Sequence, residues 1–216
     1  MSAVPQQCHY CEHSEADEVE HIYPKSWYPE RTFLWENYLL SCGNCNVTKG
    51  DQFSIFDGLH NEISLTRKRS QSVTPPPSGS AVFIDFRKEN PLDFLTLDFT
   101  TFCFTSRINQ DDRSRRRAEF TIKILDLNRS FLIEARKRHY KIYCSLLEQY
   151  VTDKKSGTLG ARDQERKRDN IWKQCHAMVW QEIINKREEK GMEEINGLFR
   201  DAPELLTRPP FYFPVS

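Results

Sequence analysis

Short alternating stretches of apolar and polar residues occupy the first part of the chain, and apolar residues at helical spacing occupy the last part. Residues 8–56 show no long helical period, which favours a small fold of short elements. Within them, residues 18–22 predict a strand closed by Pro24, and the run from residue 46 onward predicts the start of a helix. The expected order is strand, strand, helix.

The remaining pattern predicts a hairpin followed by helices. Residues 81–87 and 94–106 are rich in Phe, Thr, Val and Ile and predict two strands of one hairpin. Helical spacing is found at 117–127, 130–151 and 162–190. The proline-rich tail at 208–214 favours an extended segment.

A proline- and serine-rich stretch interrupts this order and marks a module boundary. Its composition is typical of an exposed loop. We therefore expect an α+β protein in three parts: a first module at 1–69, a loop at 70–80, and a hairpin with a mainly helical region at 81–216, which would dock a partner.

Composition adds few constraints. The 216 residues are 38% hydrophobic and 29% charged, which is typical of a folded domain with a large solvated surface. No signal peptide or membrane-spanning run is recognisable, which indicates the cytoplasm and no membrane partner. Lys+Arg and Asp+Glu both number 31, so bulk charge gives no argument for a polyanion and counts mildly against a nuclease. Basic residues are nevertheless clustered at 113–117 and 136–141.

Two cysteine pairs carry the strongest chemical signal. Cys8-x-x-Cys11 and Cys42-x-x-Cys45 can each chelate from one tight turn, and four thiolates complete the tetrahedral shell of a structural zinc site. A closed shell leaves no position for substrate, so this Zn²⁺ should organise folding. The flanking His9 and His13 are alternative ligands. The isolated cysteines are expected to be core residues: Cys103, Cys144 and Cys175.

Between the two pairs lie Glu20-His21-Ile22-x-Pro24-Lys25, then Trp35-x-Asn37, then Cys45-Asn46-x-x-Lys49. With the four cysteines, this order resembles the HNH endonuclease family. Its members place an acid-His pair on the first strand of a ββα-metal fold, an Asn in the loop, and a His or Asn at the start of the helix. The resemblance covers roughly residues 8–53 and implies a zinc-stapled ββα-metal module.

The resemblance also implies roles for individual residues. Phosphodiester hydrolysis needs an activated water and charge neutralisation, and neutral imidazole is available near neutral pH, so His21 is the expected general base. Glu20 and Asn46 are the implied ligands of a catalytic Mg²⁺ or Mn²⁺, and Asn37 is implied to orient His21. Glu20 stands where Asp is frequent in the family, which leaves its direct metal contact open. Neighbouring residues of a regular strand face opposite sides, so Glu20 and His21 should require a strand edge or a distortion to meet.

Several basic and aromatic residues have two interpretations each. The candidate nucleic-acid contacts are Lys25, Lys49, Arg115, Arg116 and Arg117, although exposed basic residues are common and an arginine run is ordinarily a solvated helix face. The aromatic residues of the small module are expected to form its core, with base stacking as the alternative: Trp27, Phe33, Trp35 and Tyr38. The three remaining isolated histidines are expected to be structural: His60, His139 and His176.

A shorter tract, residues 115–136, resembles the segment downstream of the HNH module in PtuB-like nuclease subunits of bacterial Septu-type anti-phage systems, which are sometimes associated with a retron. This implies an ABC- or SMC-like ATPase partner, with DNA favoured over RNA as substrate. One alternative is a non-catalytic zinc module that binds nucleic acid or a protein. Another is a stand-alone nuclease of the restriction or homing type.

Overall fold

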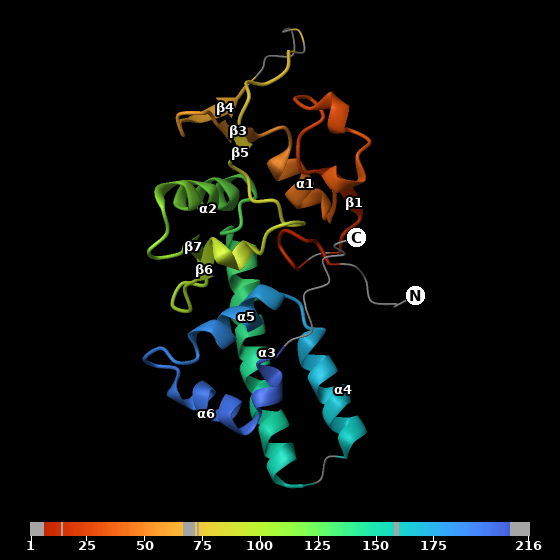
Figure 1. Ribbon diagram of the computed structural model, residues 1–216. Helices are drawn as coiled ribbons and strands as arrows, with labels where there is room; N and C mark the ends of the chain where they lie inside the picture. The colour runs from red at the N-terminus through yellow and green to blue at the C-terminus, as the bar shows by residue number, and fades with distance from the viewer. Residues whose placement is uncertain (1–6, 14, 67–71, 73, 158–159, 208–216) are drawn as a thin grey trace. The chain divides into compact units, whose positions relative to one another are not determined.

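Two antiparallel strands and a short helix follow one another at the beginning of the described chain. In the computed structural model, which describes residues 7–13, 15–66, 72, 74–157 and 160–207, β1 is Glu18–His21, β2 is Tyr38–Ser41 and α1 is Gly43–Lys49. Figure 1 shows α1 beside β1. The short 3-10 helices η1 (Pro29–Arg31) and η2 (Trp35–Asn37) lie between the strands. The predicted order of strand, strand and helix is confirmed, although α1 begins three residues earlier than predicted.

A second sheet follows directly. Its strands β3 (Phe53–Phe56), β4 (Glu62–Leu65) and β5 (Ser80–Ala81) are arranged in the order β4-β3-β5, and all four residues of β3 are buried. The predicted loop at 70–80 lies between β4 and β5, and its residues 70, 71 and 73 lie outside the described residues. Because β4 and β5 both pair with β3, this loop connects two strands of the same sheet.

The hairpin lies entirely within the second of the two segments predicted for it. Its strands are β6 (Leu95–Leu97) and β7 (Phe104–Ser106), preceded by the 3-10 helix η3 (Pro91–Asp93). The prediction that residues 81–87 form its other strand was wrong. That segment is an apolar run without a strand ladder beyond residue 81. Val82 N donates to the Ser54 carbonyl, and the other backbone bonds go to side chains: Thr121 Oγ accepts from Ile84 N, and Arg117 donates to the carbonyls of Val82 and Phe83.

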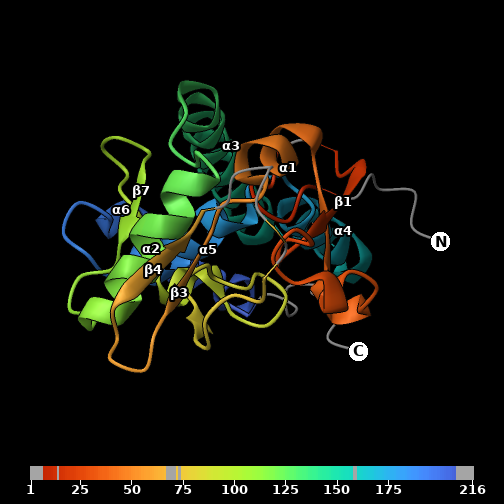
Figure 2. The same ribbon diagram turned by 90° about the horizontal axis from the view of Figure 1, so that it is seen from above.

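Helix α2 (Asp112–Ile124) runs beside the β4-β3-β5 sheet, as Figure 2 shows. Asp111 caps its N-terminus, accepting from Ser114 N at 3.0 Å. The guanidinium of Arg113 lies 4.6 Å from the ring centroid of Phe56 in β3. The first predicted helix is confirmed but starts earlier, because the arginine run belongs to it.

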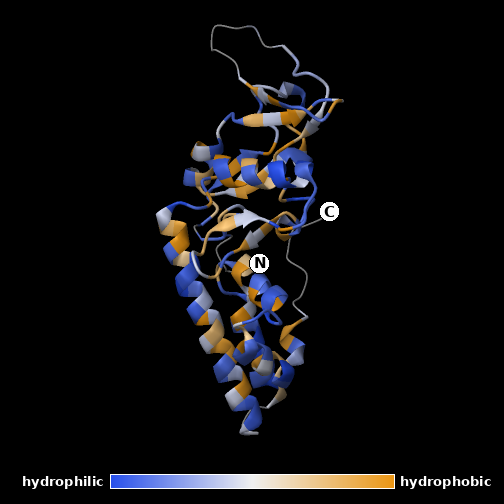
Figure 3. Ribbon diagram, turned by 90° about the vertical axis from the view of Figure 1, so that its left-hand side faces the viewer, coloured by the Kyte–Doolittle hydropathy of each residue, from blue (hydrophilic) through white to orange (hydrophobic). Residues whose placement is uncertain are grey.

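The chain forms two compact units, the first ending at Leu132 and the second beginning at Ile133. The second unit is built from α3 (Ser130–Lys155), α4 (Ala161–Trp172), α5 (Ala177–Lys186), α6 (Glu193–Asp201) and η4 (Pro203–Leu205). Figure 3 shows hydrophobic and hydrophilic residues recurring along the long helix α3. The predicted module limits at 69 and 81 stay predictions.

The core of the second unit is aromatic. The Trp180 side chain is fully buried. Its ring centroid lies 5.2 Å from that of Tyr143 and 5.5 Å from that of Phe199. The predicted helix at 130–151 is confirmed, but the single helix predicted at 162–190 was wrong. The chain breaks between α4 and α5, where His176 adopts a left-handed φ of 59° without any glycine or proline to signal the break.

The tail predicted to be extended, residues 208–214, lies outside the described residues. Among the residues that the structure describes, none of the helices has both the length and the apolar character that crossing a bilayer requires.

Candidate metal centre and catalytic site

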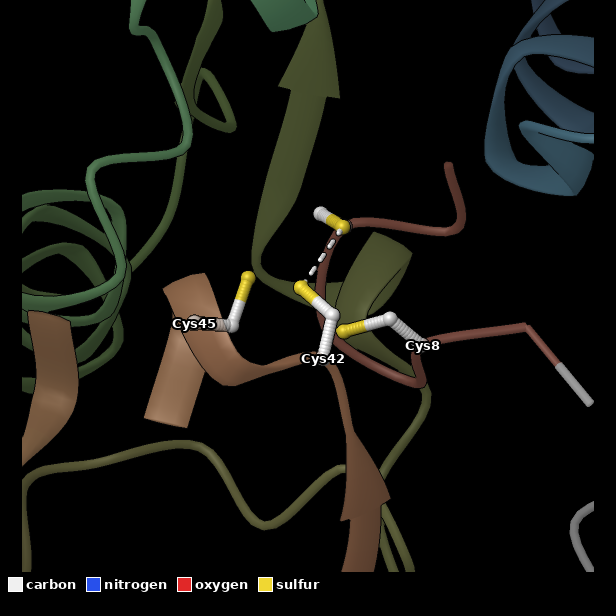
Figure 4. Close-up of side chains that lie close together, drawn as sticks. Cys8, Cys42 and Cys45 are labelled. Carbon is white, nitrogen blue, oxygen red and sulfur yellow. Dashed lines mark hydrogen bonds between the residues drawn. The ribbon is translucent and has the colours of Figure 1, made fainter. Parts of the chain in front are cut away.

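Four buried cysteine side chains converge at the start of α1. Cys8 and Cys11 come from the N-terminal turn, Cys42 immediately precedes α1, and Cys45 lies in its first turn. Their sulfur atoms all lie within 4.8 Å of one another, and the Sγ atoms of Cys11 and Cys42 are 3.9 Å apart. Figure 4 shows the sulfurs of Cys8, Cys42 and Cys45 gathered together. None of the four forms a disulfide.

This cluster fits a structural zinc ion. Zn–S bonds of about 2.3 Å in a tetrahedron place the sulfurs about 3.8 Å apart, close to the observed Cys11–Cys42 separation. Hydrogen bonding to Cys11 and burial raise the pKa of Cys8 to about 12, and hydrogen bonds to Cys11 and Cys8 raise the pKa of Cys45, so these two thiols lose their protons only with a cation beside them. Four thiolates therefore need a divalent cation among them. Neither of the alternative ligands, His9 and His13, belongs to the cluster.

A positive charge lies next to this cluster. Arg129 Nη2 is 3.8 Å from Cys45 Sγ, and Arg129 Nη1 donates to the carbonyls of Leu125 and Asp126, both at 3.2 Å. A guanidinium beside a zinc-thiolate group reduces the cost of its net negative charge. This contact could not be predicted from local spacing, because Arg129 lies 84 residues from Cys45.

Glu20 and Lys49 form a buried ion pair between β1 and α1. Lys49 Nζ lies 2.5 Å from Glu20 Oε1 and also donates to the carbonyl of His21 at 2.8 Å. The Lys49 side chain has no solvent exposure and that of Glu20 has 5%. Burial raises the pKa of Glu20 and lowers the pKa of Lys49, so the contact within the pair and the bond from Lys49 to the His21 carbonyl must offset the cost of desolvation. The predicted phosphate contact at Lys49 does not fit this burial.

Asn46 meets a different carboxylate from the one expected. Its Nδ2 donates to Glu18 Oε2 at 2.5 Å, and Glu18 lies two residues before Glu20 on the same face of β1. The predicted ligands Glu20 and Asn46 therefore have separate partners in the structure, Lys49 and Glu18.

The His21 side chain contacts a loop carbonyl. Its Nε2 lies 3.1 Å from the carbonyl oxygen of Thr32, and its ring packs edge-on against Tyr38, with centroids 5.2 Å apart. A carbonyl oxygen can only accept, so the proton of the neutral imidazole is on Nε2, and the lone pair is on Nδ1. Glu20 and His21 face opposite sides of β1, as expected for a regular strand without a distortion.

Asn37 ties this loop to the end of β1. Its Nδ2 donates to the carbonyls of Tyr23 and Arg31, at 3.0 and 3.1 Å, and its Oδ1 accepts from Tyr23 N at 2.7 Å. Its own carbonyl accepts from Ile22 N at 2.9 Å. We call the hydrogen bonds of the Asn37 side chain to Tyr23 and Arg31 the clamp. Because Arg31 immediately precedes Thr32, the clamp fixes the position of the carbonyl that His21 contacts.

The same stretch matches a known family. Residues 8–52 are similar to HNH endonucleases, and we call this stretch the HNH domain. They match the family model described as HNH endonuclease, which covers the cysteine cluster, β1, β2 and α1. No curated protein and no solved structure matches the chain.

The basic residues proposed to contact nucleic acid have varied surroundings. Within the HNH domain, Lys25 is exposed. Outside it, Arg115 pairs with Asp112 and Glu119, and Arg116 pairs with Asp112, on the surface of α2. Arg117 is largely buried and forms a two-pronged pair with Glu89, with both contacts at 2.6 Å. Arg117 thus stabilises the fold, whereas the weak surface pairs of Arg115 and Arg116 can exchange for phosphates.

The aromatic residues of the HNH domain divide into two groups. Trp27 is buried, with 9% exposure, as expected of a core residue. The expectation was wrong for Phe33 and Trp35, which are 88% and 63% exposed. Both lie in the segment between β1 and β2, where Phe33 precedes η2 and Trp35 begins it.

Proposed function

We propose that the protein is a metal-dependent nuclease that hydrolyses phosphodiester bonds, with His21 as general base. The observation that carries this proposal is the contact between His21 Nε2 and the Thr32 carbonyl inside a segment that matches the HNH family. It leaves Nδ1 as the nitrogen that can take a proton from water. Asn37 is proposed to act as a positioning residue, since it holds the Thr32 region in place.

The residues that would bind the catalytic cation are a separate part of the proposal. Glu20 and Asn46 remain the proposed ligands of Mg²⁺ or Mn²⁺, but Glu20 could serve only if Lys49 released its carboxylate. Glu18 offers a second carboxylate next to Asn46. Lys25, Arg115 and Arg116 are proposed to contact the nucleic-acid backbone.

A cleavage assay tests the proposal. Purified protein is incubated with DNA and with RNA, with and without Mg²⁺ or Mn²⁺, and compared with His21→Ala. We expect cation-dependent cleavage that falls at least about a hundredfold in His21→Ala, the usual contribution of a general base. His60→Ala is a matched control, because His60 is exposed and lies outside the HNH domain.

A second candidate is a non-catalytic zinc module that binds nucleic acid or a protein. The specific observation in its favour is the buried Glu20–Lys49 pair, which withdraws the carboxylate from any ion. Binding without cleavage by the wild-type protein under all cation conditions would support this candidate over the nuclease.

We also propose a role in anti-phage defence with an ABC- or SMC-like ATPase as partner. Its support is the resemblance of residues 115–136 to PtuB-like subunits. Co-purification from the native host, followed by the cleavage assay on the isolated complex, tests it. Cation-dependent, sequence-specific cleavage by the protein alone would instead favour a stand-alone nuclease.

A further inference from the structure

Three consecutive apolar residues project from the loop between β1 and β2. Phe33, Leu34 and Trp35 are 88%, 48% and 63% exposed. Single exposed apolar residues are ordinary, but a run of three with two aromatic rings is an exposed patch that needs an explanation. We call these three residues the aromatic loop.

The aromatic loop is held at the proposed catalytic histidine. It begins immediately after Thr32, whose carbonyl contacts His21, and it ends at η2, where Asn37 forms its clamp. The Tyr38 ring contacts both sites, with its centroid 5.2 Å from that of His21 and 6.3 Å from that of Trp35, so a molecule on the Trp35 ring lies near the imidazole of His21.

Guanidinium groups support the loop and give it positive charge. Arg87 donates to the carbonyls of Trp35 and Tyr38, and its guanidinium lies 5.6 Å from the Trp35 ring. The Arg31 guanidinium lies 4.2 Å from the Tyr23 ring. Two exposed carboxylates, Glu30 and Glu36, are also present, and Glu30 is 3.8 Å from Arg31. Two guanidinium groups, those of Arg31 and Arg87, therefore lie beside the loop, and Lys25 is close to it in the sequence.

We propose that unpaired bases of a single-stranded nucleic acid stack on Phe33 and Trp35, so that the substrate strand passes His21. Every base has a π-face that an aromatic ring can cover, and phosphates follow the guanidinium groups. In a duplex these faces are already covered by neighbouring base pairs, so the loop favours single strands. This inference rests on the proposed nuclease function for its substrate, and its test is independent of cleavage.

The test measures binding with the full chain in its zinc-bound form. Labelled 20-nucleotide single strands of DNA and of RNA, and the corresponding duplexes, are titrated with His21→Ala protein, in which the proposed cleavage is blocked, and fluorescence anisotropy is followed. The same background carries Phe33→Ala with Trp35→Ala. The matched control is Ile108→Ala, because Ile108 is 85% exposed and also lies in the first unit.

We expect single strands to bind more tightly than duplexes, and Kd to rise at least about tenfold in the double variant, in keeping with the usual contribution of base stacking. Ile108→Ala should bind as its parent does. Binding should quench tryptophan fluorescence, and Trp35→Phe should abolish most of that quenching while retaining affinity. Unchanged melting curves and zinc content should confirm that the substituted proteins are folded.

Several outcomes would overturn the inference: equal binding of duplexes and single strands, an unchanged Kd in the double variant, or no binding to any oligonucleotide, which would mark the loop as a protein interface. The two proposals fail separately. Stacking without His21-dependent cleavage in the wild-type background would refute the nuclease alone, and His21-dependent cleavage of duplexes without loop-dependent binding would refute the stacking alone. The DNA and RNA arms identify the preferred strand.

Discussion

The Nε2 atom of His21 lies 3.1 Å from the carbonyl oxygen of Thr32, a residue on the loop that follows β1. This contact fixes the tautomer of the neutral imidazole. The carbonyl keeps its position because Asn37 binds the preceding residue, Arg31, and the end of β1 at Tyr23. Asn37 is thus linked to His21 through the backbone of the loop.

Removal of the Asn37 amide should damage both stability and activity. Asn37 is 2% exposed, and Asn37→Ala leaves three buried backbone groups without their partner. We expect the free energy of unfolding to fall by about 3 kcal/mol, since each unsatisfied buried group costs about 1–3 kcal/mol. Urea unfolding followed by tryptophan fluorescence measures this. The exposed Asn61, substituted by alanine, should cost less than about 1 kcal/mol, and an equally small loss in Asn37→Ala would show that the clamp is dispensable.

The Glu20–Lys49 pair should be strongly coupled. Each single substitution, Glu20→Leu or Lys49→Met, leaves one uncompensated buried charge and should cost about 3–5 kcal/mol. The double variant should be much more stable than the sum of the two predicts, because both charges are removed together. Chemical unfolding of all four proteins measures the coupling, and additive losses would contradict it.

The same double variant separates the two roles of Glu20. A folded but inactive double variant would support Glu20 as a cation ligand, since the cleavage chemistry would be lost without loss of structure. A folded and active double variant would show that Glu20 is structural. It would favour Glu18, which lies beside Asn46, as the carboxylate that binds the cation.

The sequence predicted the parts of the site that follow from local spacing. Two Cys-x-x-Cys pairs sufficed to predict the cysteine cluster, and strand alternation correctly placed Glu20 and His21 on opposite faces. Tertiary partners were not predictable. The sequence predicts a phosphate contact at Lys49, because a local pattern does not reveal that this side chain is buried. The contact of Arg129 with Cys45 joins segments 84 residues apart, so local spacing could not predict it either.

Among the secondary-structure errors, two have clear physical causes. The apolar run at 82–86 predicts a strand, but only Val82 N bonds to the neighbouring β3, at Ser54, and the side chains of Thr121 and Arg117 bind further backbone groups of the run. The break between α4 and α5 has no glycine or proline, and it depends on a left-handed His176 that packing must stabilise. Neither cause can be seen in a single sequence.

Zinc should be required for the HNH domain to fold. Cys42→Ala removes one of four ligands, so we expect the bound zinc to fall from about one equivalent to well below half and the melting temperature to fall by about 10 °C or more, because metal binding contributes folding energy. Metal analysis and thermal melts measure both. Cys103→Ala, at a cysteine outside the cluster, should retain its zinc. An unaltered melting curve with full zinc content in Cys42→Ala would refute this prediction.

Arg129 should strengthen zinc binding without being a ligand. Arg129→Met removes the positive charge 3.8 Å from Cys45 Sγ, and we expect zinc affinity to fall about 10- to 100-fold, as is usual for partners of metal ligands. Competition with a chromogenic chelator measures the affinity. The zinc affinity of Arg129→Lys should lie between those of wild type and Arg129→Met, since lysine keeps the positive charge but lacks the planar guanidinium. Equal affinity in wild type and Arg129→Met would show that the charge has no effect on the site.

Glu204 in the second unit should make stability depend on pH. Burial by itself raises the pKa of Glu204, but hydrogen bonds from Lys154 and Tyr150 outweigh it and lower the pKa below its ordinary value of 4.5. A lowered folded-state pKa gives stability that is present above the unfolded pKa and is lost as pH falls through the folded pKa. At pH 7 we expect Glu204→Gln to be less stable than wild type by up to about 1 kcal/mol, because the pair is partly exposed.

This difference should narrow as the pH falls below about 4.5, where the wild-type carboxylate begins to take up a proton. Urea unfolding followed by circular dichroism at 222 nm, from pH 7 to 4, measures it, and comparison of the two proteins at each pH cancels the effect of zinc release on both. Glu194→Gln is the control, because Glu194 is exposed. A difference between wild type and Glu204→Gln that stays constant, or grows, toward low pH would show that the Lys154 and Tyr150 contacts do not favour the charged form of Glu204.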